Sequence, residues 1–160
     1  MLRTRLTLKL SPIILLCLGI AVLPAQAKPN FSGTWKVDTS KSDFGPIPGP
    51  DSQTDKIEHQ DPNLKVNVVS TGQMGDLNYD LAYTTDGKEV TNTVGGNEFK
   101  STVNWDGDAL VVDTKGSFNG TDFTAKDRWA VSEDGKTLTV ERHFSSSMGE
   151  ADQKVVYAKQ

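Results

Sequence analysis

The segment Asn30-Phe31-Ser32-Gly33-Thr34-Trp35-Lys36-Val37-Asp38 has the alternating pattern of a β-strand. Successive side chains of a strand point to opposite faces, so Phe31, Gly33, Trp35 and Val37 share one face. A glycine on that face lets a neighbouring backbone approach, and the indole two residues later is large enough to fill the floor of a barrel. The segment therefore predicts the first strand of a β-barrel, in which Gly33 and Trp35 have structural roles.

The chain from Gln53 onward consists of short alternating segments separated by turn signals. Leu77, Tyr79, Leu81 and Tyr83 form the clearest alternation. Four Asx-Gly pairs mark tight turns: Asp86-Gly87, Asp106-Gly107, Asn119-Gly120 and Asp134-Gly135. The spacing predicts about ten antiparallel strands and no substantial helix.

Each predicted strand is apolar on one face only, so a flat sheet would leave open edges and an uncovered apolar face. Rolling the sheet until the last strand meets the first removes both problems. We predict an all-β fold, a single up-and-down antiparallel barrel, with Val155 and Tyr157 beside Phe31 and Trp35. The proline-rich stretch Thr39–Ser52 is predicted to be a long loop or flap.

The first 27 residues have the pattern of a secretory signal peptide. A basic beginning is followed by the apolar run Pro12–Leu23 and the small-residue site Ala25-Gln26-Ala27. Cleavage after Ala27 would leave residues 28–160 as one barrel domain, either periplasmic or secreted. The segment holds three of the 17 basic residues and none of the 21 acidic ones, so the remaining domain has a net charge of −7.

An acidic surface argues against nucleic acid or an anionic membrane as partner. Cys17 is the only cysteine and falls in the signal segment, so we expect neither a disulfide nor thiol chemistry in the domain. The strands lack a wide aromatic girdle, which disfavours membrane insertion as a β-barrel. We expect a monomer.

Two charged residues fall on otherwise apolar faces. Asp127 lies between Ala125 and Trp129, and Arg142 lies between Val140 and Phe144. If Val131 faces Lys136 across the turn, Arg142 is the diagonal neighbour of Asp127. Arg142 then either holds an anionic head group with Asp127 orienting it, or forms an internal ion pair with Asp127, or packs over Trp35.

Seven aromatic residues share the predicted inward face: Tyr79, Tyr83, Phe99, Trp105, Phe123, Trp129 and Tyr157. As a group they can line a pocket for a hydrophobic ligand or fill the barrel, and the sequence does not distinguish the two. His59 and His143 lack partners at metal-ligand spacing, which leaves a lone haem-ligating histidine as the alternative to no metal and no cofactor. No Gly-x-Ser-x-Gly elbow or base-orienting constellation occurs, so we do not expect an enzyme.

Both ends of the domain resemble the calycins, the group of lipocalins and fatty-acid-binding proteins. The segment from Phe31 to Lys36 is similar to their opening strand, and Val155-Val156-Tyr157-Ala158-Lys159 is similar to the last strand of the fatty-acid-binding branch. The resemblance implies an up-and-down barrel with a ligand cavity. The sequence departs from the pattern of that branch at two places. The loop Thr39–Ser52 stands where the branch has a helix pair. Val155 stands where the arginine of its carboxylate-binding Arg-x-Tyr pair would be.

The resulting hypothesis is an exported barrel that binds a small, mostly hydrophobic molecule through an opening near Thr39–Ser52. The residues expected to bind it are Tyr79, Tyr83, Phe99, Trp129, Arg142, Asp127 and Tyr157. The alternatives are a filled structural or interaction barrel, and a non-hydrolytic enzyme on the same scaffold that uses Asp127 and Arg142.

Overall fold

The computed structural model describes residues 28–73 and 75–160, so the predicted signal peptide lies outside the described residues. These residues form ten strands: β1 (Gly33–Val37), β2 (Ser52–Gln60), β3 (Asn63–Thr71), β4 (Leu77–Thr84), β5 (Val90–Val94), β6 (Asn97–Asp106), β7 (Ala109–Phe118), β8 (Thr121–Val131), β9 (Thr137–Ser146) and β10 (Gly149–Lys159). None of the described residues belongs to a helix long and apolar enough to cross a membrane.

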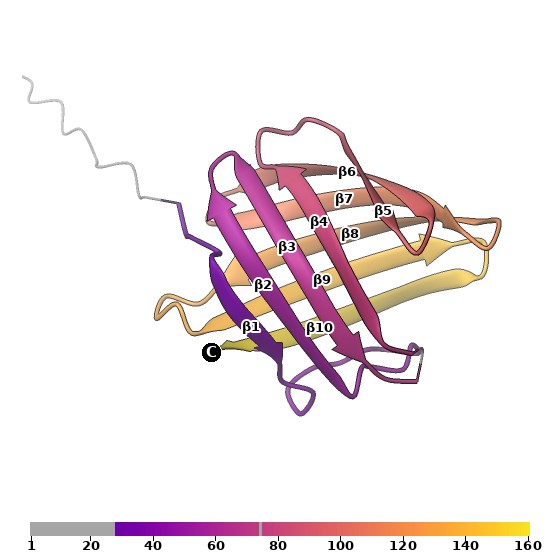
Figure 1. Ribbon diagram of the computed structural model, residues 1–160, viewed down its shortest axis with the longest axis horizontal. Helices are drawn as coiled ribbons and strands as arrows, with labels where there is room; N and C mark the ends of the chain where they lie inside the picture. Colours follow the sequence, from indigo (N-terminus) through magenta and orange to yellow (C-terminus); the bar gives the residue numbers. More distant parts are fainter. Residues whose placement is uncertain (1–27, 74) are drawn as a thin grey trace, which may run out of the picture.

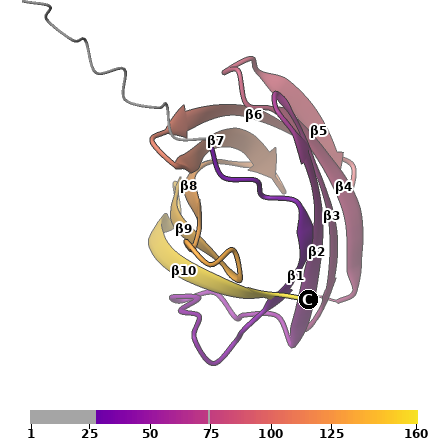
Figure 2. The same cartoon turned by 90° about the vertical axis from the view of Figure 1, so that its left-hand side faces the viewer.

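The strands form one antiparallel sheet in the order β4-β3-β2-β1-β10-β9-β8-β7-β6-β5. The first strand pairs with the last, and the sheet curls into the ring seen in Figure 2. β4 and β5 meet at a seam where the side chain of Asn92 replaces ladder pairing. Its amide oxygen accepts from the Ala82 N–H at 2.8 Å, and its amide nitrogen donates to the Ala82 carbonyl at 3.0 Å. The predicted barrel is therefore confirmed, with a seam bridged by a side chain.

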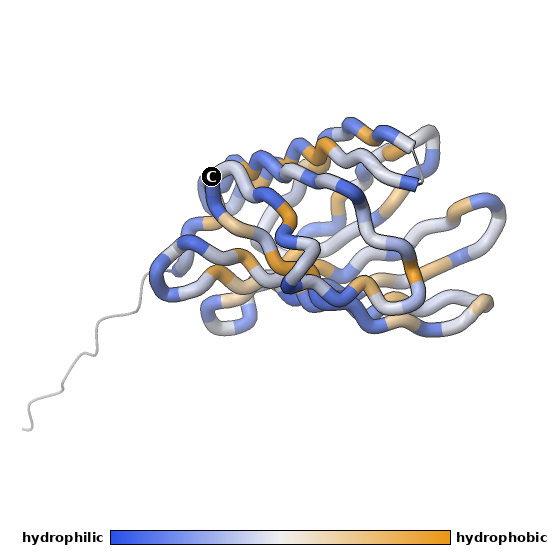
Figure 3. The backbone as a smooth tube through the Cα atoms, turned by 90° about the horizontal axis from the view of Figure 1, so that it is seen from below, coloured by the Kyte–Doolittle hydropathy of each residue, from blue (hydrophilic) through white to orange (hydrophobic). Residues whose placement is uncertain are grey.

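The alternating hydropathy of the strands matches the two faces of the barrel wall. Orange and blue segments alternate along the tube in Figure 3, as a wall with an apolar inside and a polar outside requires. Trp35, Phe31, Leu64, Leu110 and Leu138 are the largest fully buried apolar side chains. The Trp35 indole also donates to the Phe31 carbonyl at 2.9 Å, which fixes the ring in the core.

The two ends of the barrel differ. We call the end that carries residues 28–32 and the turns at 61–62, 107–108 and 132–136 the packed end, because the core described above lies there. We call the opposite end, with residues 38–51 and the turns at 95–96, 119–120 and 147–148, the loop end. Figure 1 shows the hairpins β7–β8 and β9–β10 projecting at the loop end.

The pairing of β1 with β10 corrects the predicted contacts of the opening strand. Trp35 is opposite Lys159 and Val37 is opposite Tyr157, so Tyr157 lies one inward pair away from Trp35. Val155 lies beyond the end of β1 and not beside Phe31. The space at Gly33 is filled by a side chain and not by a backbone. A Cβ there would lie 2.6 Å from Cε of Lys159, whose ammonium group lies 5.0 Å from the centre of the Trp35 ring.

The connection between β1 and β2 is a loop of residues 38–51 that follows the edge of β10. Asp43 pairs with Lys154 through two backbone hydrogen bonds of 2.7 Å, and Gln153 donates its side-chain amide to the Phe44 carbonyl at 2.9 Å. The prolines of the loop prevent a regular helix, as predicted. The loop is therefore held beside the opening at the loop end.

Candidate functional site

Exposure of the inward-facing side chains changes along the barrel. At the packed end Trp35 is fully buried, whereas at the loop end Leu77 is 40% exposed and Phe99, Phe123 and Phe144 are half-buried. Phe99, Phe123 and Phe144 face inward, since they share the parity of the buried Val103, Trp129 and Val140 on their own strands. Solvent therefore reaches the inside of the barrel at the loop end, in a region that we call the mouth.

Three phenylalanine rings form a continuous apolar strip along the wall of the mouth. Phe99 and Phe123 have ring centroids 5.5 Å apart, and Phe123 stacks on Phe144 at 5.3 Å with 24° between the planes. Phe99, Phe123 and Phe144 belong to β6, β8 and β9, so one strand lies between the first two. We call these three residues the phenylalanine strip.

Gly116 of β7 allows the strip to cross that strand. It is paired with Phe99 on one side and with Phe123 on the other. A Cβ at Gly116 would lie 2.4 Å from Cδ1 of Phe99, so the Phe99 ring occupies the space that a side chain would need. The missing side chain lets rings from β6 and β8 meet over the backbone of β7.

Arg142 and Asp127 form a two-point ion pair inside the barrel. They are directly opposite each other, with Nε to Oδ1 at 2.7 Å and a terminal guanidinium nitrogen to Oδ2 at 2.6 Å. The predicted diagonal relation was wrong, because Val131 faces Leu138 and not Lys136. The Asp127 side chain is 8% exposed and that of Arg142 is 42% exposed, so the guanidinium faces the mouth on its free side.

Two of the three interpretations of Arg142 can be compared directly with the structure. The internal ion pair is present, and the cation over the Trp35 ring is Lys159. A guanidinium bound through two hydrogen bonds to one carboxylate has its charge matched already.

A second inward carboxylate, Asp55 of β2, was not among the predicted site residues. It is 8% exposed, and its Oδ1 accepts from the side-chain amide of Gln53 at 2.9 Å. The same amide donates to the Tyr157 hydroxyl at 3.1 Å. Burial raises the pKa of Asp55 to about 6, opposed by hydrogen bonds from Gln53 and Tyr157 and by the charge of Arg142. The only signal in the sequence was its parity with Ile57 on the inner face.

The seven predicted site residues all face inward, at different depths. Tyr83 and Trp129 make an edge-to-face contact at 6.5 Å and are buried, as are Tyr157 and Asp127. Tyr79 and Phe99 are half-buried, and Arg142 is exposed to the mouth. The structure therefore brings Phe99, Tyr79 and Arg142 to the mouth and places the others beneath it. Phe144, Gln53 and Gly116 join the site without having been predicted.

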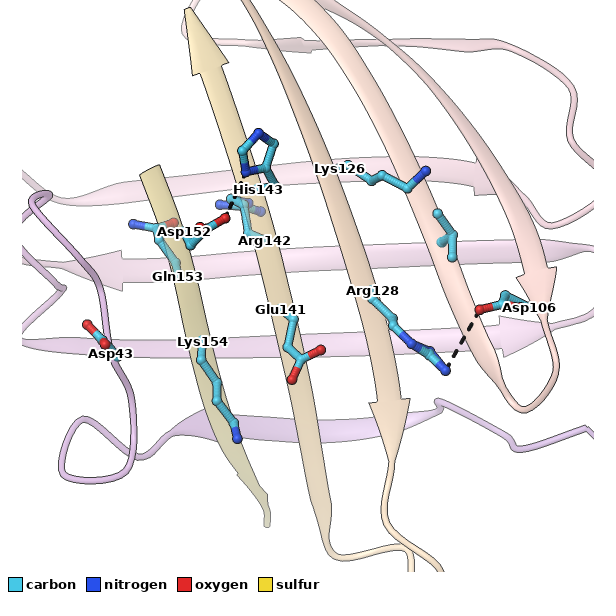
Figure 4. Close-up of a pocket in the computed structure, with 11 residues that line it drawn as sticks. Asp43, Asp106, Lys126, Arg128, Glu141, Arg142, His143, Asp152, Gln153 and Lys154 are labelled. Carbon is cyan, nitrogen blue, oxygen red and sulfur yellow. Dashed lines mark hydrogen bonds and ion pairs between the residues drawn. The ribbon is translucent and has the colours of Figure 1, made fainter. Parts of the chain in front are cut away.

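The outer wall offers a different candidate, a hollow of about 530 Å³ over β7–β10. Figure 4 shows that charged side chains line it. Lys154, Glu141 and Arg128 are cross-strand neighbours of alternating sign, and His143 contacts Asp152 at 2.7 Å. Such rows of opposite charge suit a solvated wall. Charged residues therefore line the hollow in place of the hydrophobic and aromatic side chains that are typical of a small-molecule pocket.

Within the described residues, no group of histidine, cysteine, aspartate and glutamate side chains could hold a metal ion. His59 is buried on the inner face at the packed end, where its Nδ1 accepts the Phe31 N–H at 3.3 Å. His143 lies on the outer wall. The two histidines therefore lie in different environments, and neither belongs to the mouth.

Known structures with a similar arrangement of strands identify the type of fold. No family model and no curated protein matches the sequence. Zebrafish ileal bile acid-binding protein complexed with cholic acid matches with a TM-score of 0.59 and 19% identity, over 81% of this chain and 98% of that chain. Secretory abundant heat soluble protein 4 from Ramazzottius varieornatus matches with a TM-score of 0.60 and 17% identity, over 85% and 99%.

Human cRBP IV matches with a TM-score of 0.56 and 19% identity, over 82% of this chain and 99% of that chain. These identities are low, and the similarity lies in the arrangement of the strands. The protein shares the fold of these structures, a lipocalin-like antiparallel β-barrel.

Proposed function

We propose that the protein binds a small, mostly hydrophobic molecule in the mouth of its barrel and releases it chemically unchanged. The observation that carries the proposal is the phenylalanine strip, which faces the interior and is still accessible to solvent. Burial of apolar surface is worth about 25 cal/mol per Å², so covering these rings with a ligand is favourable. A barrel filled for structure alone would bury Phe99 as completely as it buries Val103 on the same strand.

The fold supports the same proposal. Structures that share it include the bile acid-binding protein with cholic acid and a fatty acid binding protein of Schistosoma mansoni in complex with arachidonic acid, at a TM-score of 0.51. These are binding proteins, which favours binding over catalysis for this chain. We further propose that residues 1–27 direct export and that the barrel acts as a monomer in the periplasm or outside the cell.

Titration with Nile red, an uncharged apolar dye, tests binding directly. The wild-type protein should bind the dye saturably at one site. Phe123→Ala removes the middle ring of the strip and should weaken binding about tenfold, the equivalent of about 1.4 kcal/mol. Val69→Ala is the control, because Val69 is an exposed apolar residue on the outer wall of β3.

Two results would contradict the proposal: wild-type protein that leaves the dye emission unchanged, or equal weakening by Phe123→Ala and Val69→Ala. Circular dichroism melting of each variant separates loss of the site from loss of the fold.

A further inference from the structure

The charges around the base of the mouth are unbalanced, whereas the ammonium group of Lys159 lies over the Trp35 ring at the packed end. Among the described residues, three side chains that are charged at neutral pH face the interior around the base of the mouth: Asp55, Asp127 and Arg142. Asp127 and Arg142 neutralise each other through two hydrogen bonds. Asp55 is hydrogen-bonded to an uncharged amide and has no ion-pair partner among the described residues.

An ionised buried carboxylate without a cation is unfavourable, and it becomes favourable when a cation is supplied. Asp55 lies one inward position below Gln53, which begins the inner face of β2 at the loop end. A ligand that enters the mouth approaches Asp55 from that side. The half-buried hydroxyphenyl ring of Tyr79 and the phenylalanine strip offer aromatic faces, which attract an ammonium group.

The turns around the mouth are acidic as well. Asp43, Asp51, Asp76, Asp122 and Glu150 lie in or next to these turns and are exposed. Lys41, in the loop of residues 38–51, is engaged with Asp38 at 2.9 Å. The field at the opening therefore attracts cations and repels anions.

From these observations we propose that the mouth prefers hydrophobic molecules that carry an ammonium group over those that carry a carboxylate, with Asp55 as the counter-ion. The proposal rests on the proposed function and adds the chemical class of the ligand. A ligand carboxylate that reaches the free side of Arg142 meets a guanidinium whose charge Asp127 already matches through two hydrogen bonds.

The preference depends on pH through Asp55. The groups around it are Gln53 on its own strand, Tyr157 on β10, Tyr79 on β4 and the Arg142–Asp127 pair on β9 and β8, while its paired neighbours Trp35 and Val68 are uncharged. Burial raises the pKa of Asp55 to about 6, so this carboxylate is ionised at about pH 8 and neutral at about pH 5.

Displacement of Nile red by three probes of equal chain length tests the preference: dodecylamine, dodecanol and dodecanoate. At about pH 8 dodecylamine should displace the dye at a concentration at least about tenfold lower than dodecanoate. The advantage of dodecylamine over dodecanol should shrink at about pH 5, where Asp55 is protonated. This comparison uses the wild-type protein alone.

Two variants locate the effect. Asp55→Asn should reduce the preference for dodecylamine over dodecanoate to less than about threefold, and Asp127→Asn should free Arg142 and strengthen dodecanoate binding. Asp113→Asn, on the exposed outer face of β7, removes the same charge and should change neither affinity.

The outcomes separate the two proposals. If Nile red does not bind, the proposed function fails. If Nile red binds and dodecanoate displaces it as well as or better than dodecylamine, or if neither displaces it, the ammonium preference is overturned while hydrophobic binding stands. An unchanged preference in Asp55→Asn overturns the role of Asp55.

Discussion

Replacing Asp55 with asparagine should stabilise the protein above about pH 6. The folded protein raises the pKa of this carboxyl from its ordinary value of 3.8 to about 6, mainly by burial. The folded state therefore binds the proton more tightly than the unfolded state, so stability falls as the pH rises from about 4 to about 6. The difference between the two pKa values corresponds to about 3 kcal/mol at neutral pH.

Urea unfolding of wild-type protein and of Asp55→Asn, measured between about pH 4 and about pH 8, checks this value. The variant should gain stability relative to wild type as the pH rises, by about 3 kcal/mol over the whole range. Carboxyls whose pKa is lowered by hydrogen bonds, such as Asp61 and Asp86, give the opposite trend. They are present in both proteins and cancel in the difference. Asp108→Asn, in the exposed turn between β6 and β7, is the charge-matched control.

A difference between wild type and Asp55→Asn that is constant with pH would refute the reasoning. So would a difference that runs the other way, with wild type gaining stability as the pH rises. Either result would mean that a cation already neutralises Asp55 in the free protein. The argument for an ammonium ligand would then fail with it, because that argument needs an unpaired carboxylate.

Three further predictions concern other parts of the barrel. Trp35→Ala should cost about 3–5 kcal/mol in chemical unfolding, because the indole is fully buried, and a change near zero would mean that the packed end is not closed by this ring. Gly116→Ala should turn the Phe99 ring away from Phe123 and weaken Nile red binding while the melting temperature changes little, and unchanged affinity would show that the strip is not the binding surface. In an NMR titration the pKa of His59 should fall below 6.5, because burial outweighs the attraction of Asp61, and that of His143 should lie above it, because of its hydrogen bond to Asp152. Stability linked to His59 is then lost as the pH falls below about 6.5, and the reverse order of the two titrations would contradict the burial of His59.

The fold was predictable because each level of the sequence indicates the same structure. Period-two alternation marks the strands, and Asx-Gly pairs mark the turns. Registers were harder to predict, as the β8–β9 hairpin shows. Asp134 accepts hydrogen bonds from the Ser132 hydroxyl and from the Lys136 N–H, which draws Lys136 into the turn and shifts the pairing to Val131 with Leu138. The length of this turn, with Lys136 included, could not be read from the sequence pattern alone.

The site was predicted less completely than the fold, because it depends on contacts between strands that are not neighbours in the sheet. Gly116 stands out in the sequence only as a glycine within a strand, and its role in the structure is the gap over which Phe99 reaches Phe123. Phe144 has the inward parity that the sequence shows, and only the register of β9 brings it onto Phe123. Parity identified the inward side chains, and the depth of each in the barrel came from the structure.

The sequence of the last strand and the position of Arg142 both bear on whether the interior offers a free positive charge to a ligand carboxylate. The resemblance of the last strand to that of fatty-acid-binding proteins keeps Tyr157 and lacks the arginine, since Val155 stands in that position. The structure places a cation inside the barrel from the neighbouring strand, and binds that cation to Asp127. Because Tyr157 shares the Gln53 amide with Asp55, the remaining member of the pair now lies beside a carboxylate. The positive charge that would bind a fatty-acid carboxylate is therefore neutralised by Asp127, and a negative charge lies beside Tyr157. This arrangement is the physical reason to test amines before acids.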